Sequence, residues 1–176
     1  FSTLHTNSAA GVLPRLLDMG IEPFLIASTV NTIIGQRLVR RVAPKHDAYQ
    51  SSPLETQTIQ STIGHLLPQS REQVVPYAQD LGYKDLPLAG QQSYTLVRGR
   101  DTPQSPRGYL GRAGLYEVMD VTEEIQNLIV KQATSAEIQR MAVQQGMITM
   151  RQDGYLKALS GITTLEEVNR VAADTA

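Results

Sequence analysis

The sequence predicts an α/β fold, built from a partial core sheet with flanking helices, a small inserted lobe and a helical C-terminal region. Three observations support this prediction. A glycine-rich turn over 107–114 continues directly into an apolar run of strand type, 115–119. The chain before this stretch contains both helical and strand patterns, with a polar segment over 43–105. The chain after it contains several helix N-terminal signals.

The N-terminal part is predicted to contain a strand end, two helices and a second strand. Phe1–Leu4 has the character of a strand end. A helix is expected over 8–19, although Pro14 within it argues for a kink or a later start. A second helix opens at Pro23, because proline suits the first helical position, and apolar residues on most of its sides indicate a buried helix. The strand that follows is indicated by three apolar residues among arginines: Leu38, Val39 and Val42.

The segment 43–105 is rich in glutamine, serine and proline. Two helices are expected within it, over 54–67 and 70–81, the second interrupted by Pro76. Alternation over 92–97 predicts a short strand, and two prolines in 101–106 predict a loop.

The C-terminal tail is predicted to be helical because three threonines each precede a glutamate or glutamine by three positions, as in the reciprocal capping box. Thr122 precedes two glutamates that suit a helix N-terminus, and Gly161 is expected to end one helix. These signals specify local structure and say nothing of function. The three pairs are Thr134 with Glu137, Thr149 with Gln152, and Thr164 with Glu167.

Composition excludes several classes of protein. The 176 residues allow one domain or two small ones, and 41% apolar residues with no tryptophan predict an aliphatic core. A formal net charge of -1 gives no electrostatic bias toward nucleic acid, so no nucleic-acid partner is expected. No apolar run is long enough to span a membrane. The absence of cysteine excludes disulfides and thiolate metal sites.

Two features carry candidate chemistry. A lone histidine such as His5 is more often a hydrogen-bonded edge residue than a ligand contact, although an imidazole can donate to phosphate. Arg37, Arg40 and Arg41, with Lys45, form the only basic cluster, and strand alternation places Arg37 and Arg41 on one face and Arg40 on the other. The cluster could be a solvated edge, a set of ion pairs or an interface, and it lacks the aromatics of a nucleic-acid site.

Four segments resemble, in the same order, the ATPase module of bacterial type II secretion and type IV pilus assembly motors. They are spread along the chain from Ser2 to Val168, and their joint occurrence is far more specific than any one of them. They are Ser2-Thr3-Leu4-His5-Thr6-Asn7, Gln36-Arg37-Leu38-Val39-Arg40-Arg41, Gly108-Tyr109-Leu110-Gly111-Arg112-Ala113-Gly114-Leu115-Tyr116-Glu117, and Gly146-Met147 with the run from Arg151 to Val168.

The resemblance implies roles for these residues. His5 is expected near the terminal phosphate of a nucleotide, and Arg37, Arg40 and Arg41 at a subunit interface or near the nucleotide. Residues 1–45 would be the C-terminal part of a RecA-like ATPase core, 46–105 the inserted lobe, and 106–176 the closing strand and helical C-terminal region. The full motor would be a cytoplasmic homohexamer that uses ATP and magnesium and works on an inner-membrane platform protein. Pilus assembly and type II secretion both stay open, whereas retraction motors fit less well because they usually lack the inserted lobe.

Two departures from the family pattern qualify this expectation. No Gly-x-x-x-x-Gly-Lys-Ser/Thr loop and no acidic metal-holding strand occur, so the chain is expected to be a C-terminal fragment that neither hydrolyses ATP nor binds it usefully alone. The alternative is a stand-alone module that docks on the platform or regulates a full-length motor. The two Cys-x-x-Cys pairs of many members are replaced by Ala43 with His46 and Asp101 with Gln104, so no zinc is expected.

Overall fold

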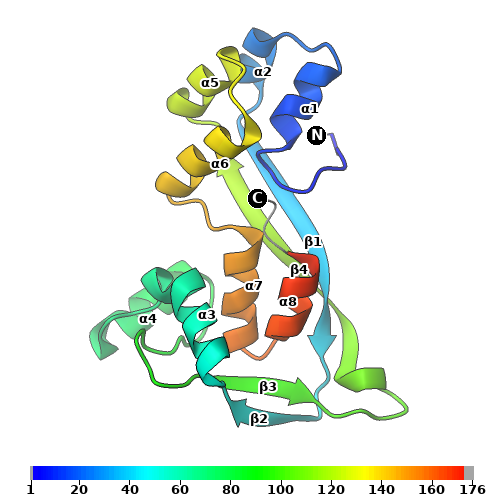
Figure 1. The fold of residues 1–176 in the computed structure, drawn as a ribbon, viewed down its shortest axis with the longest axis vertical. Helices are drawn as coiled ribbons and strands as arrows, with labels where there is room; N and C mark the ends of the chain where they lie inside the picture. Colours follow the sequence, from blue (N-terminus) through cyan, green and yellow to red (C-terminus); the bar gives the residue numbers. More distant parts are fainter. Residues whose placement is uncertain (1, 173–176) are drawn as a thin grey trace. The chain divides into compact units, whose positions relative to one another are not determined.

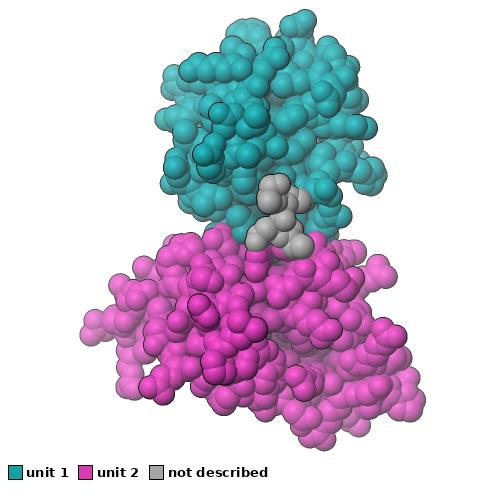
Figure 2. All heavy atoms as spheres, in the orientation of Figure 1, with its two compact units in different colours: residues 1–37, 116–150, 174–176 teal, residues 38–115, 151–173 magenta. Residues whose placement is uncertain are grey.

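A computed structural model describes residues 2–172, which form two compact units (Figures 1 and 2). Unit 1 contains residues 2–37 and 116–150, and unit 2 contains residues 38–115 and 151–172. The long strands β1 (Thr32–Val42) and β4 (Tyr109–Asp120) pair with each other and contribute residues to both units. No helix among residues 2–172 is both long enough and apolar enough to cross a bilayer.

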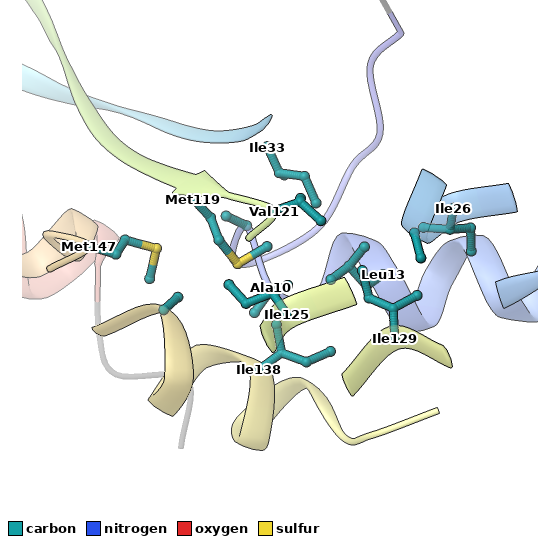
Figure 3. Packing of buried hydrophobic residues seen from close by; sticks show 13 residues of the cluster. Ala10, Leu13, Ile26, Ile33, Met119, Val121, Ile125, Ile129, Ile138 and Met147 are labelled. Atoms are coloured by element: carbon teal, nitrogen blue, oxygen red, sulfur yellow. The ribbon is translucent and has the colours of Figure 1, made fainter. Parts of the chain in front are cut away.

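Unit 1 is a layer of helices packed on one face of the ends of β1 and β4. Its helices are α1 (Val12–Asp18), α2 (Pro23–Thr29), α5 (Glu123–Val130) and α6 (Ser135–Gln144). Helix α5 packs on both α2 and α6. Figure 3 shows the aliphatic core between these elements, which includes Leu13, Ile26, Ile33, Met119, Ile125, Ile129 and Ile138.

The N-terminal predictions are partly confirmed. The first helix starts at Val12, as Pro14 suggested, and α2 starts at Pro23. The strand end predicted over Phe1–Leu4 is wrong for residues 2–4, which have no regular structure, and Phe1 lies outside the described residues. The prediction that the second helix is buried is also wrong, because α2 ends at Thr29 and buries only one face, with Ile26 and Ala27. Its outer face leaves Phe24 72% exposed.

Unit 2 contains a second, antiparallel pair of strands, β2 (His46–Gln50) and β3 (Thr95–Gly99), in a register that runs from His46 opposite Gly99 to Gln50 opposite Thr95. Between them lie α3 (Pro53–Ile63), the 3-10 turn η1 (Gly64–Leu66) and α4 (Arg71–Asp80). The predicted helices are therefore present, but Pro76 does not interrupt α4. In a helix this short, proline removes only one internal hydrogen bond. Pairing with β2 sets β3 a few residues later than the predicted strand over 92–97.

The glycine-rich stretch differs from its prediction. The turn is confined to η2 (Pro106–Gly108), and β4 already starts at Tyr109 because pairing with β1 extends the strand through the glycines. Gly108 has a φ of 79° and supplies the backbone angle that the turn needs. Gly99 and Gly108 lie with their backbones in direct contact, and no side chain fits between them.

The tail ends with α7 (Met150–Leu159) and α8 (Leu165–Val171), both in unit 2 apart from Met150. Gly161 follows α7 with a φ of 72°, as expected, and the reciprocal capping box of Thr134 and Glu137 is confirmed. Thr122 caps α5 as predicted. At α8 only half of the box forms: Thr164 accepts from the backbone of Glu167, but the Glu167 side chain has other partners. The box predicted at Thr149 stays a prediction.

Candidate functional site

His5 lies in an exposed segment without regular structure, immediately before the turn that leads into α1. We call residues 5–11 the histidine loop. Within the described part of the chain, the structure records no hydrogen bond or ion pair of the His5 imidazole. Two internal hydrogen bonds hold the loop itself. The Thr6 hydroxyl donates to the Ser8 carbonyl (2.9 Å), and the Gly11 backbone N donates to the Ser8 hydroxyl (3.2 Å). An ordered loop therefore carries an imidazole that is open to solvent.

Arg37 holds the histidine loop from the side of β1. Its Nη2 donates to Asn7 Oδ1 at 2.7 Å and to the Thr6 carbonyl oxygen at 3.4 Å. Two of the predicted site residues, His5 and Arg37, are thus brought into one neighbourhood within unit 1, through residues adjacent to His5. The Arg37 guanidinium therefore contacts the loop that carries the imidazole and helps to fix the position of that loop.

Glu117 holds the same loop from the side of β4, and the sequence analysis assigned it no role. Its Oε1 accepts from the Ala9 backbone at 2.5 Å, and its Oε2 accepts from the Met150 backbone at 3.3 Å. The residue is only 4% exposed. A Cβ on the neighbouring Gly35 would come within 2.9 Å of Glu117 Cγ, so glycine leaves the room that this side chain occupies. The available signal was an acidic residue at an inward position of an apolar strand, between Leu115 and Met119.

Replacing Glu117 by alanine is expected to destabilise unit 1. The buried amides of Ala9 and Met150 would lose their acceptor, and each buried unsatisfied group costs about 1–3 kcal/mol. We therefore expect a loss of about 2–3 kcal/mol in urea unfolding, together with faster hydrogen exchange at the Ala9 amide. Glu123→Ala, an exposed change on the same unit, is the control. Equal stability of the two variants would contradict the anchoring of the loop by Glu117.

Arg40 belongs to unit 2 and makes a different set of contacts. Its backbone N and Nη2 donate to Glu167 at 3.0 and 2.5 Å, and Arg170 donates to the same carboxylate at 3.1 and 2.8 Å. The Arg40 guanidinium also lies 4.1 Å from the centre of the Tyr109 ring. The Glu167 side chain is completely buried, so this ion-pair network fastens α8 to β1. Arg41 is exposed and shares none of these contacts, so the structure does not gather Arg37, Arg40 and Arg41 into one cluster.

Because the Glu167 carboxylate pairs with two arginines, the folded protein is expected to lose stability in acid. Burial alone would raise the pKa of Glu167, but the hydrogen bonds from Arg40 and Arg170 outweigh it and lower that pKa to about 2. In the unfolded chain a glutamate carboxyl has a pKa of about 4.3. The stabilisation that ionised Glu167 gives to the folded protein is therefore complete above that pH and is lost as the pH falls toward about 2. We expect a contribution of about 2 kcal/mol at neutral pH, reduced by solvent screening around the exposed Arg170.

Urea unfolding of the wild type and of Glu167→Gln between about pH 7 and about pH 2.5 measures this contribution. The difference in unfolding free energy between the two proteins should shrink as the pH falls. A difference that stays constant through the acid range would show that the ionised carboxylate contributes nothing.

The two ends of the segment 43–105, where the resemblance places the zinc ligands of many members, are joined by backbone hydrogen bonds. The Ala43 N donates to the Gly108 carbonyl (3.0 Å), and the Arg100 N donates to the Lys45 carbonyl (2.9 Å). Asp101 accepts from the Arg107 backbone, and a His46 ring nitrogen lies 3.2 Å from the Ala43 carbonyl. Residues 2–172 contain no group of three or more histidine or acidic side chains placed to hold a metal ion. The absence of bound zinc stays a prediction, which elemental analysis tests.

Comparison with known proteins identifies the family. A family model described as "Type II/IV secretion system protein" matches residues 1–170. Type II secretion system protein E of Xanthomonas campestris is 38% identical over 174 residues, which is 98% of this chain and 26% of that protein. The type IV pilus assembly ATPase PilB of Pseudomonas aeruginosa is 39% identical over 173 residues, and that of Myxococcus xanthus 37% over 167 residues, covering 98% and 95% of this chain. The chain spans 26% of the length of each of these three relatives.

Proposed function

The chain belongs to the type II/IV secretion system protein family, and we propose that it is the C-terminal part of a cytoplasmic ATPase motor for type IV pilus assembly or type II protein secretion. Names of both kinds occur among its relatives at nearly equal identity, so the proposal covers both processes. The full motor is proposed to be a homohexamer that acts on a platform protein at the inner membrane.

One observation of the structure supports this function above the others. The histidine loop is held on one side by Arg37 and on the other by Glu117, while the His5 imidazole stays exposed. Fixing the backbone that carries a hydrogen-bond donor reduces the reorganisation needed when the ligand arrives, which favours transition-state stabilisation. In the motor, His5 is proposed to donate a hydrogen bond to the terminal phosphate of ATP.

The 176 residues do not form a nucleotide site by themselves. The phosphate-binding loop that supplies most phosphate contacts in such enzymes is not in this sequence, and neither is an acidic strand for magnesium. ATP and magnesium are therefore proposed for the full motor only, where His5 supplies one contact among several.

The isolated chain is expected to show no ATP turnover and no magnesium-dependent ATP binding in the micromolar range. Isothermal titration with magnesium and ATP, combined with a phosphate-release assay, measures both. Micromolar binding with turnover would overturn the fragment proposal. If the coding frame upstream of Phe1 contained no phosphate-binding loop, the stand-alone interaction module would become the better proposal.

A further inference from the structure

Four arginines of unit 2 line one cavity of about 470 Å³, which we call the arginine pocket. They come from three separate parts of the chain: Arg40 from β1, Arg107 and Arg112 from the consecutive elements η2 and β4, and Arg170 from α8. The remaining lining residues are aliphatic, Leu38 and Val39, and Leu38 is 48% exposed. The lining of the pocket is therefore basic and partly aliphatic.

The positive charge of the arginine pocket is only partly compensated. Glu167 pairs with Arg40 and Arg170. Across residues 2–172, however, the structure records no side-chain hydrogen bond or ion pair of Arg107 or Arg112. Arg40 Nε is buried and also has no acceptor. Guanidinium groups present several donors in a fixed fork that matches carboxylates, so the pocket offers more donors than its own chain satisfies.

The backbone conformation of Arg107 supports a functional role for these unsatisfied guanidinium donors. Its φ is 58°, in the left-handed region that residues other than glycine rarely adopt. Such conformations persist where the surrounding structure imposes them, and they occur preferentially at functional positions. Here the conformation belongs to a residue that lines the pocket and whose side chain has no recorded partner within residues 2–172.

A second cavity, of about 370 Å³, shares Arg40 and Arg107 with the arginine pocket and indicates what kind of anion fits. Its lining carries three arginines, Arg40, Arg98 and Arg107, and three carboxyl groups, those of Glu55, Asp101 and Glu166. This mixed charge disfavours a continuous polyanion such as nucleic acid or polyphosphate, which the carboxyl groups would repel. An extended peptide fits better, because it can place acidic side chains at the arginines and neutral or basic ones beside the carboxyl groups.

Several acidic residues of residues 2–172 already have partners within their own copy and would have to give them up to enter the pocket of another copy. Arg100 pairs with Asp47 and Lys157 with Asp153, while other glutamates satisfy helix N-termini. The glutamates engaged in capping boxes are Glu55 and Glu137. A second copy would have to break such contacts before it could enter the pocket.

We propose that the arginine pocket docks an extended acidic segment of a different protein. Carboxylates of that segment pair with Arg107 and Arg112, and one of its apolar side chains rests on Leu38. This binding needs neither ATP nor the other parts of a motor, so it can be tested on the isolated chain, and its failure would leave the proposed function untouched.

The probe is a short fluorescein-labelled peptide of alternating glutamate and leucine, followed by fluorescence anisotropy. We expect binding that weakens by about tenfold or more in Arg112→Gln and in Arg107→Gln, as is usual when a charge-assisted hydrogen bond is lost. Arg112→Lys keeps the positive charge but loses the forked donor geometry of the guanidinium. Its affinity for the peptide should therefore lie between those of the wild type and of Arg112→Gln. Arg71→Gln, an exposed change in α4 outside both cavities, is the matched control and should bind as the wild type does. Binding should also weaken as salt rises.

Three results would overturn the proposal. The first is absence of peptide binding, or an equal loss in Arg71→Gln, which would show that the pocket is not the site. The second is displacement of the peptide by inorganic pyrophosphate at a lower concentration than by unlabelled peptide, which would indicate a phosphate site. The third is a dimer in sedimentation that Arg112→Gln abolishes, which would identify a second copy as the occupant.

Discussion

Gly99→Ala is expected to destabilise unit 2 by at least about 3 kcal/mol, the range reached when overpacking cannot be relieved by side-chain movement. A Cβ on Gly99 would lie only 2.6 Å from the carbonyl carbon of Gly108 and closer still to its oxygen. The opposing atoms are backbone, so no rotamer change can relieve the overlap. The same contact fastens the inserted lobe, because Ala43 donates to that Gly108 carbonyl.

Urea unfolding at neutral pH measures the effect, with Gly64→Ala as the control. Gly64 has helical backbone angles, and a Cβ there would have its nearest neighbour at 3.9 Å. This control should be neutral or more stable by about 0.4–1 kcal/mol, because alanine restricts the unfolded chain. If Gly99→Ala cost no more than about 1 kcal/mol, the backbone contact between Gly99 and Gly108 would be wrong.

His5→Ala in the full-length parent is expected to lower ATP turnover by about a hundred- to a thousand-fold, equivalent to about 2.7–4 kcal/mol. This expectation rests on the proposed function. The imidazole is exposed and has no recorded partner within residues 2–172, so its removal should leave the fold intact. A donor aimed at a terminal phosphate would instead be lost from the transition state, which lowers turnover more than nucleotide affinity.

Turnover and thermal unfolding should be measured on the same preparation. His65→Ala, an exposed histidine of unit 2, is the control and should keep near-normal turnover. Normal turnover of His5→Ala would remove the catalytic role. Inactivity that merely accompanies a lower melting temperature would make His5 a structural residue.

Features that depend on a few neighbouring residues were predictable from the sequence. Pro23 opens α2, Gly161 follows α7, and Thr134 with Glu137 forms the capping box of α6. Each of these involves groups within about four positions, where proline, glycine and short polar side chains restrict the backbone directly. Recognition of the family also depended on short local segments, and the family model that matches residues 1–170 confirms it.

The roles of the two buried glutamates were decided only by the tertiary structure. Local spacing assigned Glu167 to the cap of α8, yet its carboxylate pairs with Arg40, which is 127 positions away, because a charged guanidinium is a stronger donor than a neutral amide. Glu117 has no cap to form with its sequence neighbours, and its carboxylate accepts from the backbone N of Ala9, 108 positions away. The same holds for the arginines. Alternation along β1 gives Arg37 and Arg40 a face each, but only folding brings Arg37 to the histidine loop and Arg107 and Arg112 to Arg40.

Sequence therefore determined the local elements and the family. Long-range hydrogen bonds and charge pairs, which no spacing rule encodes, decided what each charged residue contacts.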